Sequence, residues 1–207
     1  MSIRKKILAI SIGPVLVLGV ITLLFMLTMV KSSLMDEVQD ALKGTAAATL
    51  AAYDQNTGDY LESTNGDIWK GSYNISKSES LVDRIKENTG MDVTFFYGNK
   101  RIMTSALDKK GNRILGSEAG ERVVNQVIKG KKPFFSTNVS LDGTRNYGYF
   151  IPVYQNGTTD QVIGMVFVGT NKARKDAIVN KILGSIMMAL LVVMLLFQVL
   201  LFLQFQV

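Results

Sequence analysis

Two long apolar segments at opposite ends of the chain set the strongest limit on how it can fold. Residues 7–30 contain no charged side chain, and neither do residues 182–203. As a helix, about 20 apolar residues cross the roughly 30 Å hydrocarbon core of a bilayer. We therefore predict one transmembrane helix over residues 7–30 and a second over residues 178–207. No small-residue cleavage pattern follows Val30, so the first segment is expected to stay as an anchor and not to be removed as a signal peptide.

The charges beside the first apolar segment predict which side of the membrane each part faces. Three basic residues precede this segment: Arg4, Lys5 and Lys6. Basic flanks stay in the cytoplasm, so residues 1–6 are expected inside the cell, residues 31–177 outside, and the chain is expected to cross the plasma membrane twice. Basic residues within 172–175 would then lie outside, but long translocated domains largely ignore such charges.

The composition excludes several kinds of chemistry. The chain has no Cys and no His, which rules out disulfides, the usual zinc sites and catalysis by a histidine base. The acidic residues are dispersed and no glycine-rich phosphate loop is present, so we expect no metal, no cofactor and no enzymatic activity. The net charge is +6, but the basic residues are scattered and several flank the apolar segments. We therefore expect contacts with the membrane and not with nucleic acid.

Residues 31–177 have the size of one compact domain. Apolar and small residues spaced three and four apart predict that the first span continues as a helix to about Asn56. Residues 56–76 are rich in Gly, Asn, Ser and Thr and are interpreted as turns. Further helices are predicted at 79–88 and 119–129, and strands at 91–96, 101–106, 134–141, 146–154 and 161–169. This order predicts an α+β domain with a five-stranded antiparallel sheet and helices on one side.

Several segments of the middle domain carry a family resemblance. MDVTFFYGNKRIMTS (91–105), NRILGSEA (112–119) and the run from Phe134 to Gly169 resemble the single Cache domains of bacterial methyl-accepting chemotaxis proteins and sensor kinases. These segments cover about half of the middle domain, and their order and spacing are more specific than any one motif. The resemblance implies a PAS-like Cache domain, with a long N-terminal helix and a five-stranded antiparallel sheet, between two transmembrane helices.

The resemblance also implies a function. The chain would be the extracellular small-ligand sensing module of a transmembrane receptor, most simply a methyl-accepting chemotaxis protein, that passes ligand binding to the second transmembrane helix. The alternatives are the sensor half of a histidine kinase or diguanylate cyclase, and a membrane-anchored interaction protein that senses nothing. The family implies a homodimer. Because the sequence stops at the second span, we expect a fragment of a longer receptor, without its downstream cytoplasmic signalling domain.

Members of this family hold a small ligand between the sheet and the loops that cross it. Strand alternation puts Arg101, Met103 and Ser105 on one face of their strand and puts Tyr147 and Tyr149 on one face of theirs. The candidate ligand-binding residues are Arg101, Thr104, Ser105, Tyr147 and Tyr149, with Trp69 as a lid. An arginine fork with hydroxyl donors suits a carboxylate, so a carboxylate or an amino acid is the favoured ligand.

A structural role for the same residues is the alternative. The two tyrosines would then belong to the core with their hydroxyl groups at the surface. Arg101 would be a solvated charge on a hairpin, and Trp69 would anchor an irregular loop.

Overall fold

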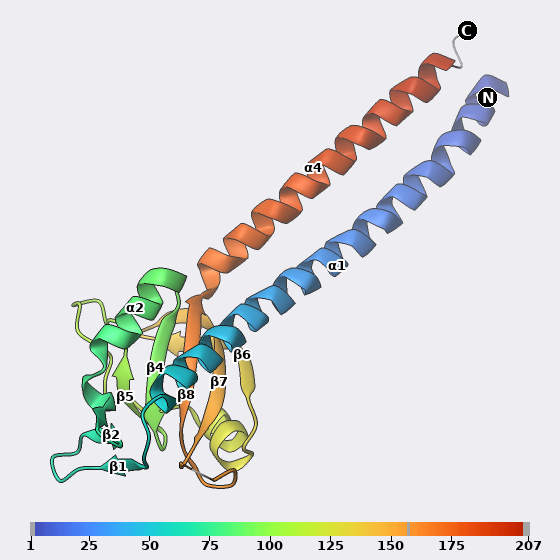
Figure 1. The fold of residues 1–207 in the computed structure, drawn as a ribbon. Coiled ribbons are helices and arrows are strands. Elements are labelled where there is room, and N and C mark those ends of the chain that lie inside the picture. Colours follow the sequence, from blue (N-terminus) through green and yellow to red (C-terminus); the bar gives the residue numbers. More distant parts are fainter. Residues whose placement is uncertain (1–2, 157, 205–207) are drawn as a thin grey trace. The chain divides into compact units, whose positions relative to one another are not determined.

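The computed structural model describes residues 3–156 and 158–204, and these fall into two units (Figure 1). One unit comprises the two ends of the chain, up to Glu37 and from Asp176 onward, and the other spans Val38–Lys175. Helices α1 (Ile3–Asp54) and α4 (Lys172–Gln204) each contribute to both units. The predictions made for residues 1–2 and 205–207 lie outside the described residues.

The first unit consists of apolar helix. Both α1 and α4 are long and apolar enough to cross a membrane. Large apolar side chains point outward along them, and Phe25 and Met188 are 68% and 69% exposed. The two helices approach one another at Gly19, where an added Cβ would lie 2.8 Å from the Met194 side chain. Side chains of this kind are stable in lipid and unfavourable in water, as expected for the two apolar segments of the sequence.

The second unit is built on a five-stranded sheet in the order β5-β4-β8-β7-β6, with every neighbouring pair antiparallel. Its strands are β4 (Asp92–Tyr97), β5 (Lys100–Thr104), β6 (Phe134–Leu141), β7 (Thr144–Tyr154) and β8 (Val162–Asn171). The five predicted strands and the α+β class are thereby confirmed. The last strand in the sequence, β8, lies at the centre of the sheet between β4 and β7.

The second half of α1 packs on one face of this sheet. Val38, Leu42 and Tyr53 are buried, and the Tyr53 ring meets the Phe95 ring edge-on at 5.2 Å between centroids. The shorter helix α2 (Glu79–Thr89) packs beside β4 and β5. It ends at Gly90, whose φ of 68° is the left-handed conformation that favours glycine at a helix C-terminus.

A second, three-stranded sheet occupies the segment that the sequence analysis interpreted as turns. It contains β1 (Tyr60–Glu62), β2 (Ile68–Lys70) and β3 (Tyr73–Asn74), followed by the short 3-10 helix η1 (Ile75–Lys77). The turn residues between the strands dominate the sequence pattern because each strand has only two or three residues. The small sheet nevertheless buries the side chains of Tyr60 and Ile68.

The opposite face of the large sheet is covered by α3 (Glu121–Val123) and the π-helical segment η2 (Val124–Lys129). Val127 of η2 belongs to a buried cluster with Phe96, Phe150 and Phe167 of the sheet. Phe95 and Phe96 are neighbours on β4, so the α1 face and the η2 face are opposite faces of one sheet. Helices therefore cover both faces, whereas the sequence analysis placed them on one side.

Candidate ligand-binding site

A cavity of about 520 Å³ lies against the face of the large sheet that carries α3 and η2. Its size falls within the range of small-molecule sites, roughly 300–1,000 Å³. It is lined by Phe96, Arg101, Glu118, Ala119, Gly120, Arg122, Val123, Phe134, Phe135, Ser136, Thr137, Asn138, Val139, Ser140, Phe150 and Phe167. Aromatic rings from the sheet form one side, and polar residues of β6 and the segment before α3 form the rest.

Phenylalanine rings form a continuous wall of the cavity. The Phe150 ring lies 4.7 Å from the Phe167 ring and 6.4 Å from the Phe134 ring, measured between centroids. The Phe167 ring crosses a pair of opposed glycines, Gly148 and Gly169. An added Cβ would lie 2.5 Å from this ring at Gly148 and 2.4 Å from it at Gly169. Both positions therefore need glycine to leave room for the ring.

Arg101 is the buried charge in the cavity wall. Its side chain is 7% exposed, and its guanidinium carbon lies 5.3 Å from the centroid of the Phe96 ring. Nη1 donates a hydrogen bond to the Ile114 carbonyl oxygen at 3.3 Å. Nε is buried and has no hydrogen-bond partner among the residues that the structure describes. Burial lowers the pKa of Arg101, and the Asp92 carboxylate opposes this shift. Arginine side chains in proteins keep their charge at neutral pH.

A β-bulge directs Arg101 into the cavity. Arg101 pairs with Phe96, and Met103 pairs with the adjacent residue Phe95, so one extra residue is inserted in β5. Because neighbours on β4 point to opposite faces, Arg101 and Met103 also point to opposite faces. The prediction that Arg101, Met103 and Ser105 share one face is wrong for Arg101, because the β4–β5 ladder is interrupted between Arg101 and Met103.

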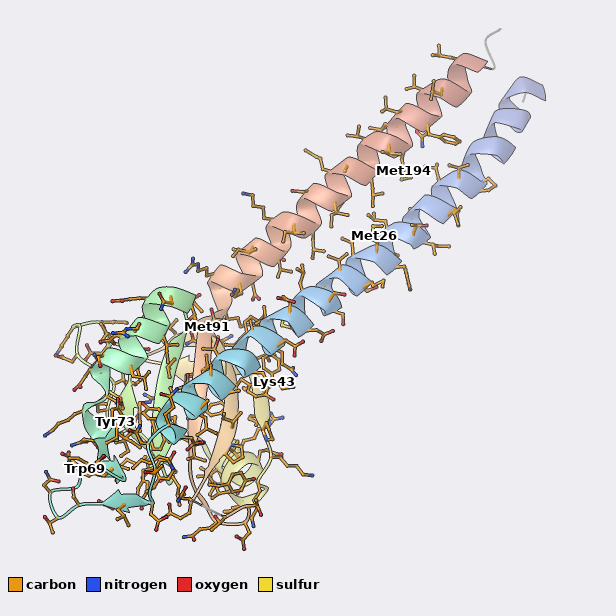
Figure 2. All side chains as sticks on the ribbon, viewed as in Figure 1. Met26, Lys43, Trp69, Tyr73, Met91 and Met194 are labelled. Atoms are coloured by element: carbon orange, nitrogen blue, oxygen red, sulfur yellow. The ribbon has the colours of Figure 1, made fainter. Side chains whose placement is uncertain are left out.

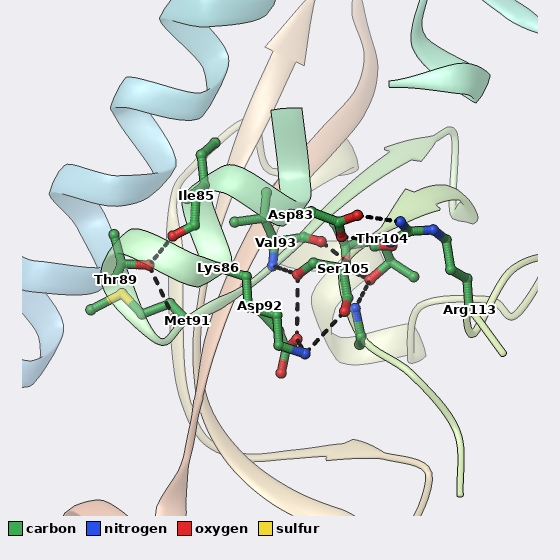
Figure 3. A network of polar contacts seen from close by, with 12 residues as sticks. Asp83, Ile85, Lys86, Thr89, Met91, Asp92, Val93, Thr104, Ser105 and Arg113 are labelled. Atoms are coloured by element: carbon green, nitrogen blue, oxygen red, sulfur yellow. Dashed lines mark hydrogen bonds and ion pairs between the residues drawn. The ribbon is translucent and has the colours of Figure 1, made fainter. Parts of the chain in front are cut away.

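Thr104 and Ser105 lie in a polar network outside the cavity lining (Figure 3). The Thr104 hydroxyl shares a hydrogen bond of 2.7 Å with the hydroxyl of Thr94 on the neighbouring strand. The Ser105 hydroxyl donates to the Asp92 carboxylate at 3.3 Å, and the Lys86 ammonium binds that carboxylate at 2.8 Å. These contacts tie the end of β5 to β4 and α2.

Arg113 adds a second link to the same region (Figure 3). Its guanidinium forms a two-pronged ion pair with Asp83 of α2 and donates to the Thr104 carbonyl oxygen at 2.7 Å. The hydrogen bonds from Arg113 lower the pKa of the Asp83 carboxyl group. α2 is therefore fastened to the strand that carries Arg101.

The two predicted tyrosines lie on the other face of the sheet. Tyr147 and Tyr149 alternate along β7 with Phe150, which faces the cavity. The Tyr147 ring stacks on the Phe135 ring at 6.3 Å between centroids. Its hydroxyl group accepts a hydrogen bond of 2.6 Å from Lys172, the first residue of α4. Tyr147 therefore joins the sheet to the start of α4, and neither tyrosine lines the cavity.

Trp69 lies in the small sheet (Figure 2). It is half-buried and pairs across the strands with Leu61, while its neighbours Ile68 and Lys70 are buried. It does not line the cavity, so of the six predicted ligand residues the structure places Arg101 alone there.

Sequence reasoning missed the phenylalanine wall, Glu118 and Arg122. Strand alternation marks the phenylalanines as buried without showing that a space remains beside them.

Comparison with known proteins identifies a domain family. The family model for single Cache domain 3 matches residues 73–182, which is more than half of the 207 residues. No curated protein matches the chain. An extracellular ligand binding receptor from Desulfohalobium retbaense DSM5692 is 14% identical with a TM-score of 0.51, over 74% of this chain and 26% of its own. That likeness shows a shared fold, and the chain spans about a quarter of the length of that receptor.

Two further solved structures are more distant. The sensor domain of E. coli DcuS is 13% identical with a TM-score of 0.41, over 73% of this chain and 98% of its own. A structure titled methyl-accepting chemotaxis protein X is 15% identical with a TM-score of 0.37, over 72% of this chain and 64% of its own.

Proposed function

The chain belongs to the single Cache domain 3 family, and from this premise we propose that it is the extracellular sensing module of a transmembrane receptor of the methyl-accepting chemotaxis type. The module binds a small organic ligand outside the cell and passes the binding event to α4. The observation that carries this proposal is Arg101, a buried cation with an unpaired Nε in the wall of a ligand-sized cavity. No salt bridge joins Arg101 to a carboxylate in the part of the chain that the structure describes.

A carboxylate is the ligand group that this arginine fits. A buried charge without a counterion is unfavourable, and an anion in the cavity would supply both the opposite charge and the missing hydrogen-bond acceptor. Stacking on Phe96 holds the guanidinium in place before a ligand arrives, which reduces the ordering cost of binding. Thr104 and Ser105 act indirectly in this proposal, because their hydrogen bonds fix the strand from which Arg101 projects.

The route from the cavity to the membrane follows β8. Phe167 of β8 lines the cavity, and β8 continues without a break into α4 at Lys172. A ligand that contacts Phe167 better in one arrangement of the sheet than in another shifts the balance between the two arrangements. The start of α4 then moves with the strand, as small helix shifts do in other switching proteins.

We expect the receptor to work as a homodimer in the plasma membrane, with the N-terminus in the cytoplasm. The face of α1 turned away from its own sheet is lined by exposed small residues, including Gly44, Ala47, Ala48 and Ala51. Small residues let two helix backbones approach closely. Because the chain has no Cys, an Ala48→Cys variant should form a disulfide-linked dimer on mild oxidation. A variant with Cys at the exposed α2 residue Glu87 should not, and equal cross-linking of both would contradict this interface.

Thermal unfolding of the full chain in lipid nanodiscs tests the sensing function. A ligand that binds only the folded domain raises its melting temperature, with roughly 2.7 kcal/mol of stabilisation at a hundredfold excess over Kd. We expect at least one small carboxylate to produce such a shift and the Arg101→Gln variant to lose it. A folded chain that responds to no carboxylate, amino acid or amine would rule out direct sensing and favour an anchored interaction protein.

A further inference from the structure

We infer that the cavity takes an organic acid with a single anionic group and an apolar body about the size of one ring. This inference rests on the proposed sensing function and names the chemical class of its ligand. Three features of the lining support it: its charge, the position of its aromatic rings and the placement of its polar groups.

The charge of the lining favours one anionic group. Arg101 is the buried charge, whereas the other two charged residues of the lining, Glu118 and Arg122, are exposed and of opposite sign. The Arg122 guanidinium carbon lies 5.3 Å from the centroid of the Phe134 ring, at the rim. A second carboxylate carried into the interior would find phenyl rings and no second buried cation. Such a group keeps its charge only at a large desolvation cost, so a dianion is disfavoured.

The aromatic wall favours an apolar body attached to that anionic group. Phe96, Phe150 and Phe167 are 2%, 3% and 1% exposed, so their positions are fixed by packing. The Arg101 guanidinium stacks on Phe96, and therefore an anion held by Arg101 lies at the edge of this wall. The rest of the ligand then meets the half-buried apolar residues packed against these rings, Phe134 and Val139, where an aromatic or branched apolar group gains burial.

Apart from Arg101 and the half-buried Ser136, the polar side chains of the lining are exposed and lie at the rim. The uncharged ones come from the irregular part of β6, where the register shifts between Ser136 and Val139. The side chains of Thr137, Asn138 and Ser140 are exposed. A ligand that carries hydroxyl groups all around, such as a sugar acid, would place some of them against phenyl rings without hydrogen-bond partners.

Four probes that differ in one property each test this inference on the full chain in nanodiscs, with Kd measured by isothermal titration calorimetry. Phenylacetate has one charge and a ring, acetate lacks the ring, succinate adds a charge, and phenethylamine reverses the charge. We expect phenylacetate to bind at least about tenfold more tightly than each of the other three probes.

Variants then locate the binding event. Arg101→Gln should weaken phenylacetate binding by about tenfold or more, whereas Arg84→Gln, at an exposed arginine of α2 outside the lining, should leave Kd unchanged. Phe134→Ala should weaken phenylacetate binding and leave acetate binding unchanged, because Phe134 contacts the body and not the anionic group. Circular dichroism melts identify any variant that fails to fold, and the probe series on the unaltered chain does not depend on them.

The outcomes distinguish failure of the ligand-class inference from failure of the proposed sensing function. Tighter binding of succinate than of phenylacetate, lost in Arg101→Gln, would overturn the monoanion inference and leave the sensing function standing. Tighter binding of phenethylamine would overturn the inference in the same way. Binding by none of the four probes would overturn this inference, and a thermal screen in which another carboxylate shifts the melting temperature would leave carboxylate sensing standing. Phenylacetate binding that survives Arg101→Gln unchanged would show that the cavity described here is not the site.

Discussion

Gly164 of β8 lies directly against the backbone of β4. A Cβ added there would sit 2.0 Å from the Phe96 carbonyl oxygen and 3.2 Å from the Tyr97 Cα atom. The obstacle is backbone, which cannot rotate away as a flexible side chain can. The requirement for glycine at this position therefore comes from the close approach of two strands.

Gly164→Ala should lower the free energy of unfolding of the domain by about 2–3 kcal/mol, because the central strands must separate to admit the methyl group. Chemical denaturation of the full chain in detergent measures the change. Gly120→Ala is the matched control, since an added Cβ at Gly120 meets no atom within 4 Å. Equal stability of the two variants would show that the strands accommodate a methyl group without strain.

The Asp83–Arg113 ion pair makes stability depend on pH. The hydrogen bonds from Arg113 lower the pKa of Asp83 in the folded state, so the pair contributes stability above the ordinary carboxyl pKa of about 4. That contribution is lost as the pH falls through the lowered pKa. Asp83→Asn should therefore destabilise the domain at pH 7, by less than about 1 kcal/mol because the pair is partly exposed to solvent.

The difference between the unaltered chain and Asp83→Asn should shrink as the pH falls below about 4, and denaturant titrations at pH 7 and pH 3 measure it. Glu87→Gln on the same helix, an exposed residue, should show no such difference at either pH. A gap between the unaltered chain and Asp83→Asn that persists at pH 3 would contradict the assigned role of the ion pair.

Lys172 contributes to holding the junction of β8 with α4. Lys172 donates to the Tyr147 hydroxyl group at 2.6 Å, and its ammonium lies 4.2 Å from the centroid of the same ring. The first residue of α4 is thereby fixed to β7, the strand beside β8. Loss of this contact should loosen the start of the helix without altering the cavity on the other face.

Lys172→Met should lower the free energy of local opening at the start of α4 by about 1 kcal/mol, seen as faster amide hydrogen exchange over the first turn. Carboxylate affinity should stay unchanged. Arg174→Met serves as the control, because the Arg174 side chain is exposed and its backbone N–H keeps its bond to Asn171. Weaker ligand binding in Lys172→Met would show that the cavity and the junction are not separable in this way.

The regular elements were predictable because they follow one rule along their whole length. Strand β8 is apolar for most of its length, and α2 ends at a glycine that a left-handed terminus needs. The predictions that failed concern places where the backbone pattern changes within a few residues. The extra residue at Ile102 leaves no mark in the pattern, yet it moves Arg101 to the opposite face from Met103. The sequence therefore nominated Arg101, which lines the cavity, but not the other lining residues, whose positions depend on this register.

The lack of cysteine in the whole chain gives a direct way to establish its orientation in the membrane. Single cysteines can be placed without competing thiols. We expect Ser117→Cys, at an exposed position of the outer domain, to react with a membrane-impermeant maleimide in intact cells. Ser2→Cys should react only after the membrane is opened, because the basic residues beside the first span favour a cytoplasmic N-terminus. The reverse labelling pattern would invert the proposed topology and place the cavity in the cytoplasm.

The central position of β8 limits how far this strand can be displaced along its own axis. The strand is paired on both sides, from Gly164 to Gly169 with β4 and along nearly its whole length with β7. A slide by one residue would turn Phe167 out of the cavity and move every side chain of β8 to the opposite face of the sheet. β8 therefore cannot shift to the next register and keep its buried side chains buried. The travel open to β8 is therefore shorter than one residue step, about 3.3 Å. In the proposed sensing mechanism, ligand binding would therefore move the start of α4 by less than this distance.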